Sequence, residues 1–264
     1  MAAVRKEEVV LPQRVPILMY HSIAGPGEPA GRYSVPVDRF RKQIAFLRRL
    51  GFSPYTLDDL AEGRAGGEKP VVITFDDGYR DNLKYALPVL EEYGFKATFF
   101  IVSGLAGKRA EWVHGSRELM NWEEIRQVRD RGMNLGAHSR THKRLSSLDQ
   151  WQIVSEIEGS RRDIEENTGI SVRHFSYPYG CYSASIAETV GDSGFHTACT
   201  TDSGFASASP SFMRLRRIEV TGMDSVFIFG CKLIYGDNNP SIKQKILGLL
   251  YLTAEMLAWR RMHF

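Results

Sequence analysis

Short apolar runs alternate with helix-like segments along most of this chain, and this alternation constrains the fold more than any other feature of the sequence. Residues 71–73 (VVI) are apolar without a break, which is typical of a strand covered on both faces of a parallel sheet. Alternating strands and helices imply right-handed crossovers, and therefore a barrel or a doubly wound sheet. On this basis we predict seven strands: Val15–Tyr20, Val71–Phe75, Ala97–Val102, Asn134–Ala137, Arg173–Tyr177, His196–Cys199 and Leu215–Val220.

Helical patterns fit between these strands. Apolar side chains from Phe40 to Leu50 recur at helical spacing, and Gly51 is a typical residue to end that helix. Asn121 followed by Glu124 indicates a helix N-cap, and a further helix is predicted from Asp149 to Asn167. The 264 residues suit one (β/α) barrel, which typically takes about 250. We therefore predict an α/β fold with a single domain, a deformed (β/α)7-type barrel.

The composition of the chain divides it into three segments. Residues 1–14 are predicted to be an N-terminal extension, 15–239 the barrel domain and 240–264 an apolar C-terminal helix. The first segment lacks the long apolar run of a secretory signal, so we expect the chain to stay in the cytoplasm.

The C-terminal segment is the most apolar part of the chain. Ile246–Trp259 is interrupted only by Thr253 and Glu255, and Arg260-Arg261 follows it. A helix of this length spans about 21 Å, which is shorter than a hydrocarbon core of about 30 Å. Two interpretations stay open: a helix that packs or forms a homodimer, and a helix that lies on the inner face of a membrane.

Charge and cysteine content exclude several classes of protein. The chain has 34 basic and 31 acidic residues, a formal net charge of +3, and no basic stripe that would indicate a nucleic-acid partner. Its three cysteines (Cys181, Cys199 and Cys231) are too few and uneven in number for a secreted disulfide framework.

Two adjacent carboxylates form the sharpest local motif, Thr74-Phe75-Asp76-Asp77-Gly78, at the end of an apolar strand. Burying such a pair is costly unless a metal or a shared proton compensates it. Both side chains can serve one site only where the strand ends and the chain turns, and Gly78 permits that turn. The alternative is a simple N-cap and turn before a helix that starts near Tyr79.

Histidines and a tight turn follow other predicted strands. His138-Ser139-Arg140-Thr141-His142 comes after Asn134–Ala137, and two imidazoles with one carboxylate form a triad that can hold a metal. Pro178-Tyr179-Gly180 makes a turn after another strand, and His21 ends the first one. The carboxyl ends of parallel strands share one rim, so these residues are predicted to lie together.

Taken together, these motifs resemble those of the polysaccharide deacetylases, the NodB-homology family of metal-dependent carbohydrate esterases. TFDDG at Thr74–Gly78, HSxTH at His138–His142 and PYG at Pro178–Gly180 match the three family motifs. The opening Pro16–His21 resembles a subgroup with permuted strand order, in which the catalytic histidine sits near the N-terminus. The resemblance runs from about Val15 to Val220 and makes 15–239 a NodB-like catalytic domain.

The resemblance implies a carbohydrate substrate and a role for each motif residue. Asp77, His138 and His142 would bind the metal, usually zinc. Asp76 would be the general base and His21 the general acid. The turn Pro178–Gly180 would line the substrate site, where the Tyr179 N–H would hold the oxyanion.

The chain departs from the family pattern at Ser176. Most members have an arginine there that orients the catalytic aspartate. Arg214, Arg216 and Arg217 are candidates to replace it, and we choose Arg217. Two residues, Trp112 and Trp122, are candidates for the family's tryptophan motif. Trp122 is better explained as a core residue at the start of a helix.

Three other functions remain open. One is hydrolysis of a different carbon–nitrogen bond, for example in a small cyclic amide. A second is a catalytically dead sugar-binding module, which Ser176 alone favours. A third is a non-haem Fe(II) oxygenase, although the HxD spacing common there is absent.

Overall fold

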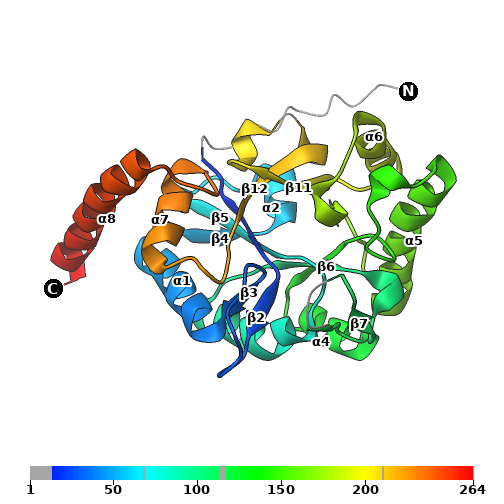
Figure 1. Cartoon of the computed structure of the whole chain (residues 1–264), viewed down its shortest axis with the longest axis horizontal. Coiled ribbons are helices and arrows are strands. Elements are labelled where there is room, and N and C mark those ends of the chain that lie inside the picture. Colours follow the sequence, from blue (N-terminus) through cyan, green and yellow to red (C-terminus); the bar gives the residue numbers. More distant parts are fainter. Residues whose placement is uncertain (1–13, 68, 113–116, 210, 264) are drawn as a thin grey trace.

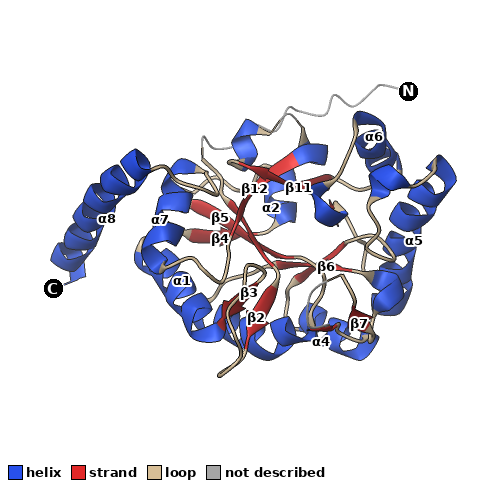
Figure 2. Ribbon diagram, in the orientation of Figure 1, coloured by secondary structure: helices blue, strands red, loops and turns tan. Residues whose placement is uncertain are grey.

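The structure, a computed structural model, describes residues 14–67, 69–112, 117–209 and 211–263. Seven parallel strands form its centre, and helices surround them (Figures 1 and 2). In order around the barrel these are β1 (Ile17–Tyr20), β12 (Leu215–Glu219), β11 (Thr197–Ser203), β10 (His174–Ser176), β9 (Asn134–Ala137), β6 (Thr98–Ile101) and β5 (Pro70–Phe75). Pairing of β1 with β5 closes the ring, which confirms the predicted barrel.

Each predicted strand range overlaps one barrel strand, although β11 runs past the predicted end at Cys199 as far as Ser203, and the helices lie between the strands. The helices are α1 (Val37–Arg49), α3 (Leu87–Tyr93), α4 (Trp122–Asp130), α5 (Gln150–Thr168), α6 (Ala184–Asp192) and α7 (Val226–Tyr235). Capping boxes at Asn121 and Asp149 begin α4 and α5, which confirms both predicted helix starts. Gly51, at φ 75°, follows the end of α1.

Several short elements were not predicted. β4 (Ser53–Tyr55) pairs with the start of β5, and α2 (Leu57–Ala61) follows it. β2 (Ser22–Ala24) and β3 (Ser34–Pro36) pair with each other in the segment between β1 and α1. A second small pair joins β7 (Arg109–Ala110) to β8 (Arg117–Glu118).

The helix after β5 also differs from a regular α-helix. A π-helical turn, η1 (Asn82–Ala86), leads directly into α3. It places Asp81 and Asn82 beside the segment that follows β1, where both make contacts described below.

Two sets of side chains fill the inside and the outside of the barrel. Leu18, Tyr20 and Phe75 belong to the large cluster that packs against the surrounding helices. Alternate residues on a strand point to opposite faces, so Ile17 and Leu215, in a separate buried cluster, lie inside. The same alternation points Arg217 and Glu219 of β12 into the barrel, toward its carboxyl end.

α8 (Ile242–His263) follows α7, packs against it and lies at the outer edge of the molecule (Figure 1). Its described side chains include five exposed apolar ones: Ile246, Leu247, Leu249, Leu250 and Tyr251. Among the described residues, no helix has the length and apolar character needed to cross a membrane. The predicted division at residues 14 and 240 stays a prediction, and residues 1–13 lie outside the described part of the chain.

Candidate active site

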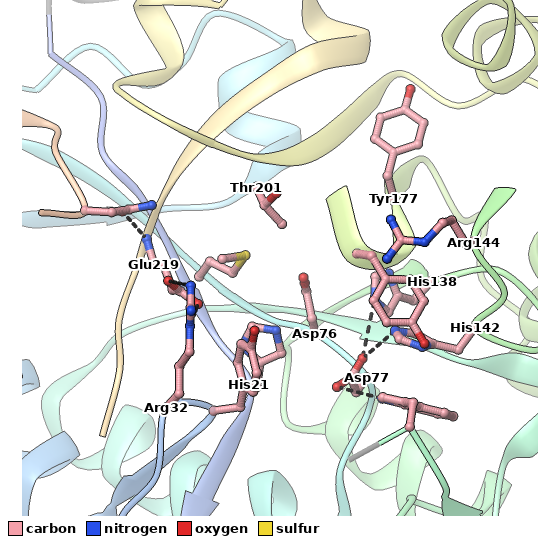
Figure 3. A pocket seen from close by; sticks show the side chains of 15 residues that line it. His21, Arg32, Asp76, Asp77, His138, His142, Arg144, Tyr177, Thr201 and Glu219 are labelled. Atoms are coloured by element: carbon pink, nitrogen blue, oxygen red, sulfur yellow. Dashed lines mark hydrogen bonds and ion pairs between the residues drawn. The ribbon is translucent and has the colours of Figure 1, made fainter. Parts of the chain in front are cut away.

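A cavity of about 530 Å³ lies at the carboxyl ends of the barrel strands. Side chains from every predicted motif line it, namely His21, Asp76, Asp77, His138, His142 and Tyr179. Figure 3 shows the two aspartates and two histidines converging in it, with His21 opposite. The rim that the parallel-strand argument predicted is therefore where these residues meet.

Asp77, His138 and His142 form one compact group. One potential ligand atom from each lies within 4.8 Å of the others, and all three side chains are buried. Asp77 Oδ1 lies 3.4 Å from His138 Nε2 and 3.1 Å from His142 Nε2. His138 Nδ1 lies 2.7 Å from the Ser176 carbonyl oxygen, which can only accept, so Nδ1 carries the proton. The lone pair of Nε2 then faces Asp77, and the donor set fits a divalent metal.

The protonation states of Asp77 and His142 are those that metal ligands need, an ionised carboxylate and a neutral imidazole. Burial raises the pKa of Asp77, but hydrogen bonds from His138 and His142 outweigh it and hold that pKa well below its usual value. Burial lowers the pKa of His142, which favours the neutral imidazole. The neighbouring aspartates outweigh burial at His138 and raise its pKa, so cation binding there would release a proton.

The backbone turn that presents Asp77 is tighter than predicted. Gly78 has φ 72°, which agrees with the turn predicted there. The backbone of Asp77 is also in the left-handed region, at φ 76°. His142 also has a positive φ, at 58°. Two members of the Asp-His-His group are thus held in a backbone region that non-glycine residues seldom occupy.

Asp76 makes a buried, bidentate ion pair with Arg217. Arg217 donates from Nη1 to Oδ1 at 2.8 Å and from Nη2 to Oδ2 at 2.6 Å. Ser176 Oγ donates to Asp76 Oδ2 at 3.2 Å and accepts from Arg217 Nη2 at 3.0 Å. Burial raises the pKa of Asp76, but the charges of Arg217 and His138 and the hydrogen bonds from Arg217 together outweigh it and lower that pKa, so the carboxylate stays ionised. The guanidinium missing at position 176 of β10 is supplied instead by β12, two strands away in the barrel.

His21 extends from the end of β1 into the cavity. Its ring lies 4.9 Å from that of Tyr33, and its Nδ1 has no partner among the described residues. Asn82 Nδ2 donates to the His21 carbonyl oxygen at 2.8 Å. Asp81 accepts from Ser22 Oγ at 2.6 Å and from the Ile23 N–H at 3.0 Å. The first turn after β5 therefore fixes the backbone that carries His21.

A pH-dependent contribution to stability should come from Asp81. Burial raises its pKa to about 6, against about 3.9 in an unfolded chain. The folded protein therefore binds this proton more tightly, so wild type should lose stability relative to Asp81→Asn as the pH rises from about 4 through 6. The loss should reach at most about 3 kcal/mol, measured by chemical denaturation of both proteins at pH 4–8. A difference that stayed flat or grew in the other direction would contradict the burial argument.

Tyr179 lies in the turn after β10, at φ 59°. The turn's own backbone hydrogen bonds join Gly180 N to Tyr177 O at 2.8 Å and Cys181 N to Pro178 O at 3.2 Å. Neither uses the Tyr179 N–H. The Tyr179 ring lies 4.7 Å from the His142 ring, so the turn adjoins the Asp-His-His group.

The two tryptophan candidates separate clearly. Trp112 stacks on His142, with ring centres 4.1 Å apart, and its Nε1 donates to Asp77 Oδ2 at 3.4 Å. Trp122 packs against the main core, as the sequence indicated. The cavity residues that sequence reasoning missed include three charged side chains and a tyrosine, namely Arg32, Arg144, Glu219 and Tyr33. Strand alternation could have found Glu219, while the other three lie on loops and carry no such signal.

This fold and site are matched by known proteins. A family model described as "Polysaccharide deacetylase" matches residues 63–198. "Putative polysaccharide deacetylase YxkH" of Bacillus subtilis is 30% identical over 223 residues, 83% of this chain and 76% of that protein. The chain therefore belongs to the polysaccharide deacetylase family.

Two further comparisons extend this result. The poly-beta-1,6-N-acetyl-D-glucosamine N-deacetylase of Escherichia coli is 24% identical over 270 residues, 86% of this chain but 37% of that protein. The solved structure of the Streptococcus pyogenes deacetylase PplD in complex with acetate superposes with a TM-score of 0.72 at 24% identity. It covers 83% of this chain and 97% of its own, and it shows the shared fold.

Proposed function

We propose that this chain is a metal-dependent hydrolase that removes N-acetyl groups from an amino sugar in a polysaccharide or a glycan precursor. The observation that carries the proposal is the convergence of three parts in one cavity. These parts are the Asp77-His138-His142 group, the Asp76–Arg217 pair and His21. Family membership and the names of the relatives, which include an N-acetylglucosamine N-deacetylase, support the same reaction.

Zinc is the divalent cation that we propose for the Asp-His-His group. Imidazole nitrogen and carboxylate oxygen suit zinc, and three protein ligands leave a position open for catalysis. Such a cation lowers the pKa of water and polarises a carbonyl group.

The residues around this group supply the remaining functions. Asp76 is ionised and can accept the proton of the attacking water, while Arg217 and Ser176 fix both of its oxygens. The Tyr179 N–H is the proposed donor to the oxyanion. His21 is the proposed acid that protonates the leaving amine, because it lines the cavity and its Nδ1 has no partner among the described residues.

Acetate release tests this function directly. The purified chain should release acetate from N-acetylglucosamine oligomers, lose that activity in chelator and regain it with added zinc. The lost activity follows from the cation's role in activating water, and acetate is measured by a coupled assay. Release that persisted unchanged after complete metal removal would contradict the proposal.

The same assay separates the alternatives. Hydrolysis of a small cyclic amide without acetate release would favour the other carbon–nitrogen hydrolase. Sugar binding without release would favour a dead module. The argument for a dead module rested on Ser176, and the Asp76–Arg217 pair weakens it, because Asp76 has a guanidinium partner.

We also propose that the protein lies in the cytoplasm and that α8 contacts the inner face of a membrane. Its exposed apolar side chains, such as Leu250 at 65% exposure, are joined by exposed Lys243 and half-buried Lys245. Apolar side chains with nearby lysines suit an anionic lipid surface. The side chains of the predicted anchor Arg260-Arg261 lie outside the described residues.

Deletion of residues 247–264 should shift the protein from the membrane fraction to the soluble fraction, because it removes most of the exposed apolar surface of α8. Fractionation followed by immunoblotting measures the shift. A smaller shift is expected for the full-length chain with Leu250→Glu, and Asp130→Ala, an exposed substitution on α4, is the control.

An unchanged distribution between the two fractions would contradict the proposed membrane contact. A fall from dimer to monomer in ultracentrifugation would instead assign α8 to a homodimer.

A further inference from the structure

Three arginines surround the reactive centre, and two of them already have carboxylate partners. Arg217 pairs with Asp76 at 2.6 Å, and Arg32 pairs with the largely buried Glu219 at 3.1 Å. Arg144 lines the cavity too, and it has no carboxylate oxygen within 4 Å in the described part of the chain. Of the two described arginines that line the cavity, Arg32 has a carboxylate partner and Arg144 has none, so the charge of Arg144 is left available to a ligand.

Side chains beside the Asp-His-His group hold Arg144 in place. Its guanidinium carbon lies 4.7 Å from the centre of the Tyr179 ring, and it donates a hydrogen bond to Cys181 Sγ. The Tyr179 ring contacts His142 in turn, at 4.7 Å. Figure 3 places Arg144 next to His138 and His142, on the side of the cavity away from Arg32. A ring contact and a thiol orient the cation without neutralising it.

The balance of charge in the cavity then favours a negative ligand. The Asp76–Arg217 and Glu219–Arg32 pairs each cancel. A divalent cation on Asp77 would exceed the single charge of that carboxylate, so Arg144 adds to an already positive cavity. A neutral N-acetylated sugar offers no group that matches this excess, whereas a carboxylate or phosphate can pair with the guanidinium fork.

We propose that Arg144 makes this site selective for an amino-sugar substrate that carries a negatively charged group close to the N-acetyl group. The inference rests on the proposed deacetylase function and specifies its substrate class. Arg144 is a specificity-determining residue here and takes no part in bond making or breaking.

Three probes test the inference by acetate release. N-acetylchitotetraose is neutral, UDP-N-acetylglucosamine carries phosphates, and a tetrasaccharide that alternates N-acetylglucosamine with N-acetylmuramic acid carries carboxylates. Wild type should show a higher kcat/KM for at least one charged probe than for the neutral one. Arg144→Met should reduce that ratio about tenfold or more, because it removes one charge-assisted contact that only the charged probe can make.

Matched variants separate this role from a structural one. Arg144→Lys should keep part of the preference, and Arg144→Glu should invert it. Lys143→Met removes the same charge from an exposed neighbour that does not line the cavity, and should leave the ratio unchanged. The wild-type preference should also weaken as the salt concentration rises.

The outcomes are distinguishable. A preference confined to the phosphate probe or to the carboxylate probe supports the inference and identifies the anion. A ratio that Arg144→Met does not change, or a wild type that prefers the neutral probe, overturns the inference and leaves the deacetylase function standing. No acetate from any of the three probes overturns the proposed function, and this inference with it.

Discussion

Replacement of Asp76 by asparagine is expected to lower kcat for acetate release by about 10²–10⁴-fold while metal content stays near that of wild type. The amide cannot accept the proton of water, yet its oxygen can still accept from Arg217, and Asp76 is not a member of the metal group. Acetate release and metal content per chain, measured by atomic emission, are the two readouts.

Asp77→Ala is the matched companion. It removes one of the three proposed ligands, so activity and metal content should fall together. Asp76→Asn protein with wild-type turnover would refute the assignment of the base. Loss of metal from Asp76→Asn as well would refute the division of roles between the two aspartates.

Replacement of Arg217 by methionine is expected to have the largest effect on stability. It leaves the fully buried Asp76 carboxylate without its guanidinium, which typically costs about 3–5 kcal/mol, and activity should fall as the base loses its orientation. The free energy of unfolding from chemical denaturation at pH 7 measures the loss. Arg216→Met is the control, because Arg216 is only partly buried and makes one long contact, to Ser203 O at 3.4 Å.

The loss of stability in Arg217→Met should depend on pH. Arg217 lowers the pKa of Asp76 in the folded wild type, so this stabilisation is present above the unfolded pKa of about 3.9 and is lost as the pH falls. Without Arg217, the largest contribution that lowers this pKa is gone, and burial, which raises it, is opposed less. The difference between the two proteins should therefore shrink as the pH falls toward 4. The double variant Asp76→Asn/Arg217→Met removes both charges of this pair, so neither is left buried without its partner, and it should regain stability. A pH-independent difference would contradict an ion-pair origin.

Most of the barrel could be predicted because short stretches of sequence indicate its strands and helix starts. Examples are the apolar run from Val71 to Phe75 and the capping boxes at Asn121 and Asp149, each of which spans only a few residues. By contrast, β4 and the β2–β3 pair are three residues long and depend on partners elsewhere in the chain. Their formation is decided by tertiary contact, which short patterns do not encode.

The site follows the same division. The motif residues were found from the sequence because strand ends of a parallel sheet meet at one rim. Arg217 was chosen among three arginines without a geometric reason, and strand alternation now provides one, since Leu215 and Glu219 flank it on the inner face of β12. Other features of the site could not be predicted from local sequence patterns. The left-handed backbone of Asp77 is a conformational feature, and the contacts of Asp81, Asn82 and Arg144 join residues far apart in the chain.

Left-handed backbone is concentrated at the site. In the described part of the chain, the non-glycine residues with positive φ are Asp77, Ser139, His142 and Tyr179, and all lie in the three motifs. Each such residue costs of order 1 kcal/mol or more, and glycine would relieve that cost. At Asp77 and His142, the change that would make the chain easier to fold would also remove a proposed metal ligand. Selection for stability alone would therefore tend to remove catalytic activity. Variants screened only for higher thermal stability should be checked first for substitutions at these four positions.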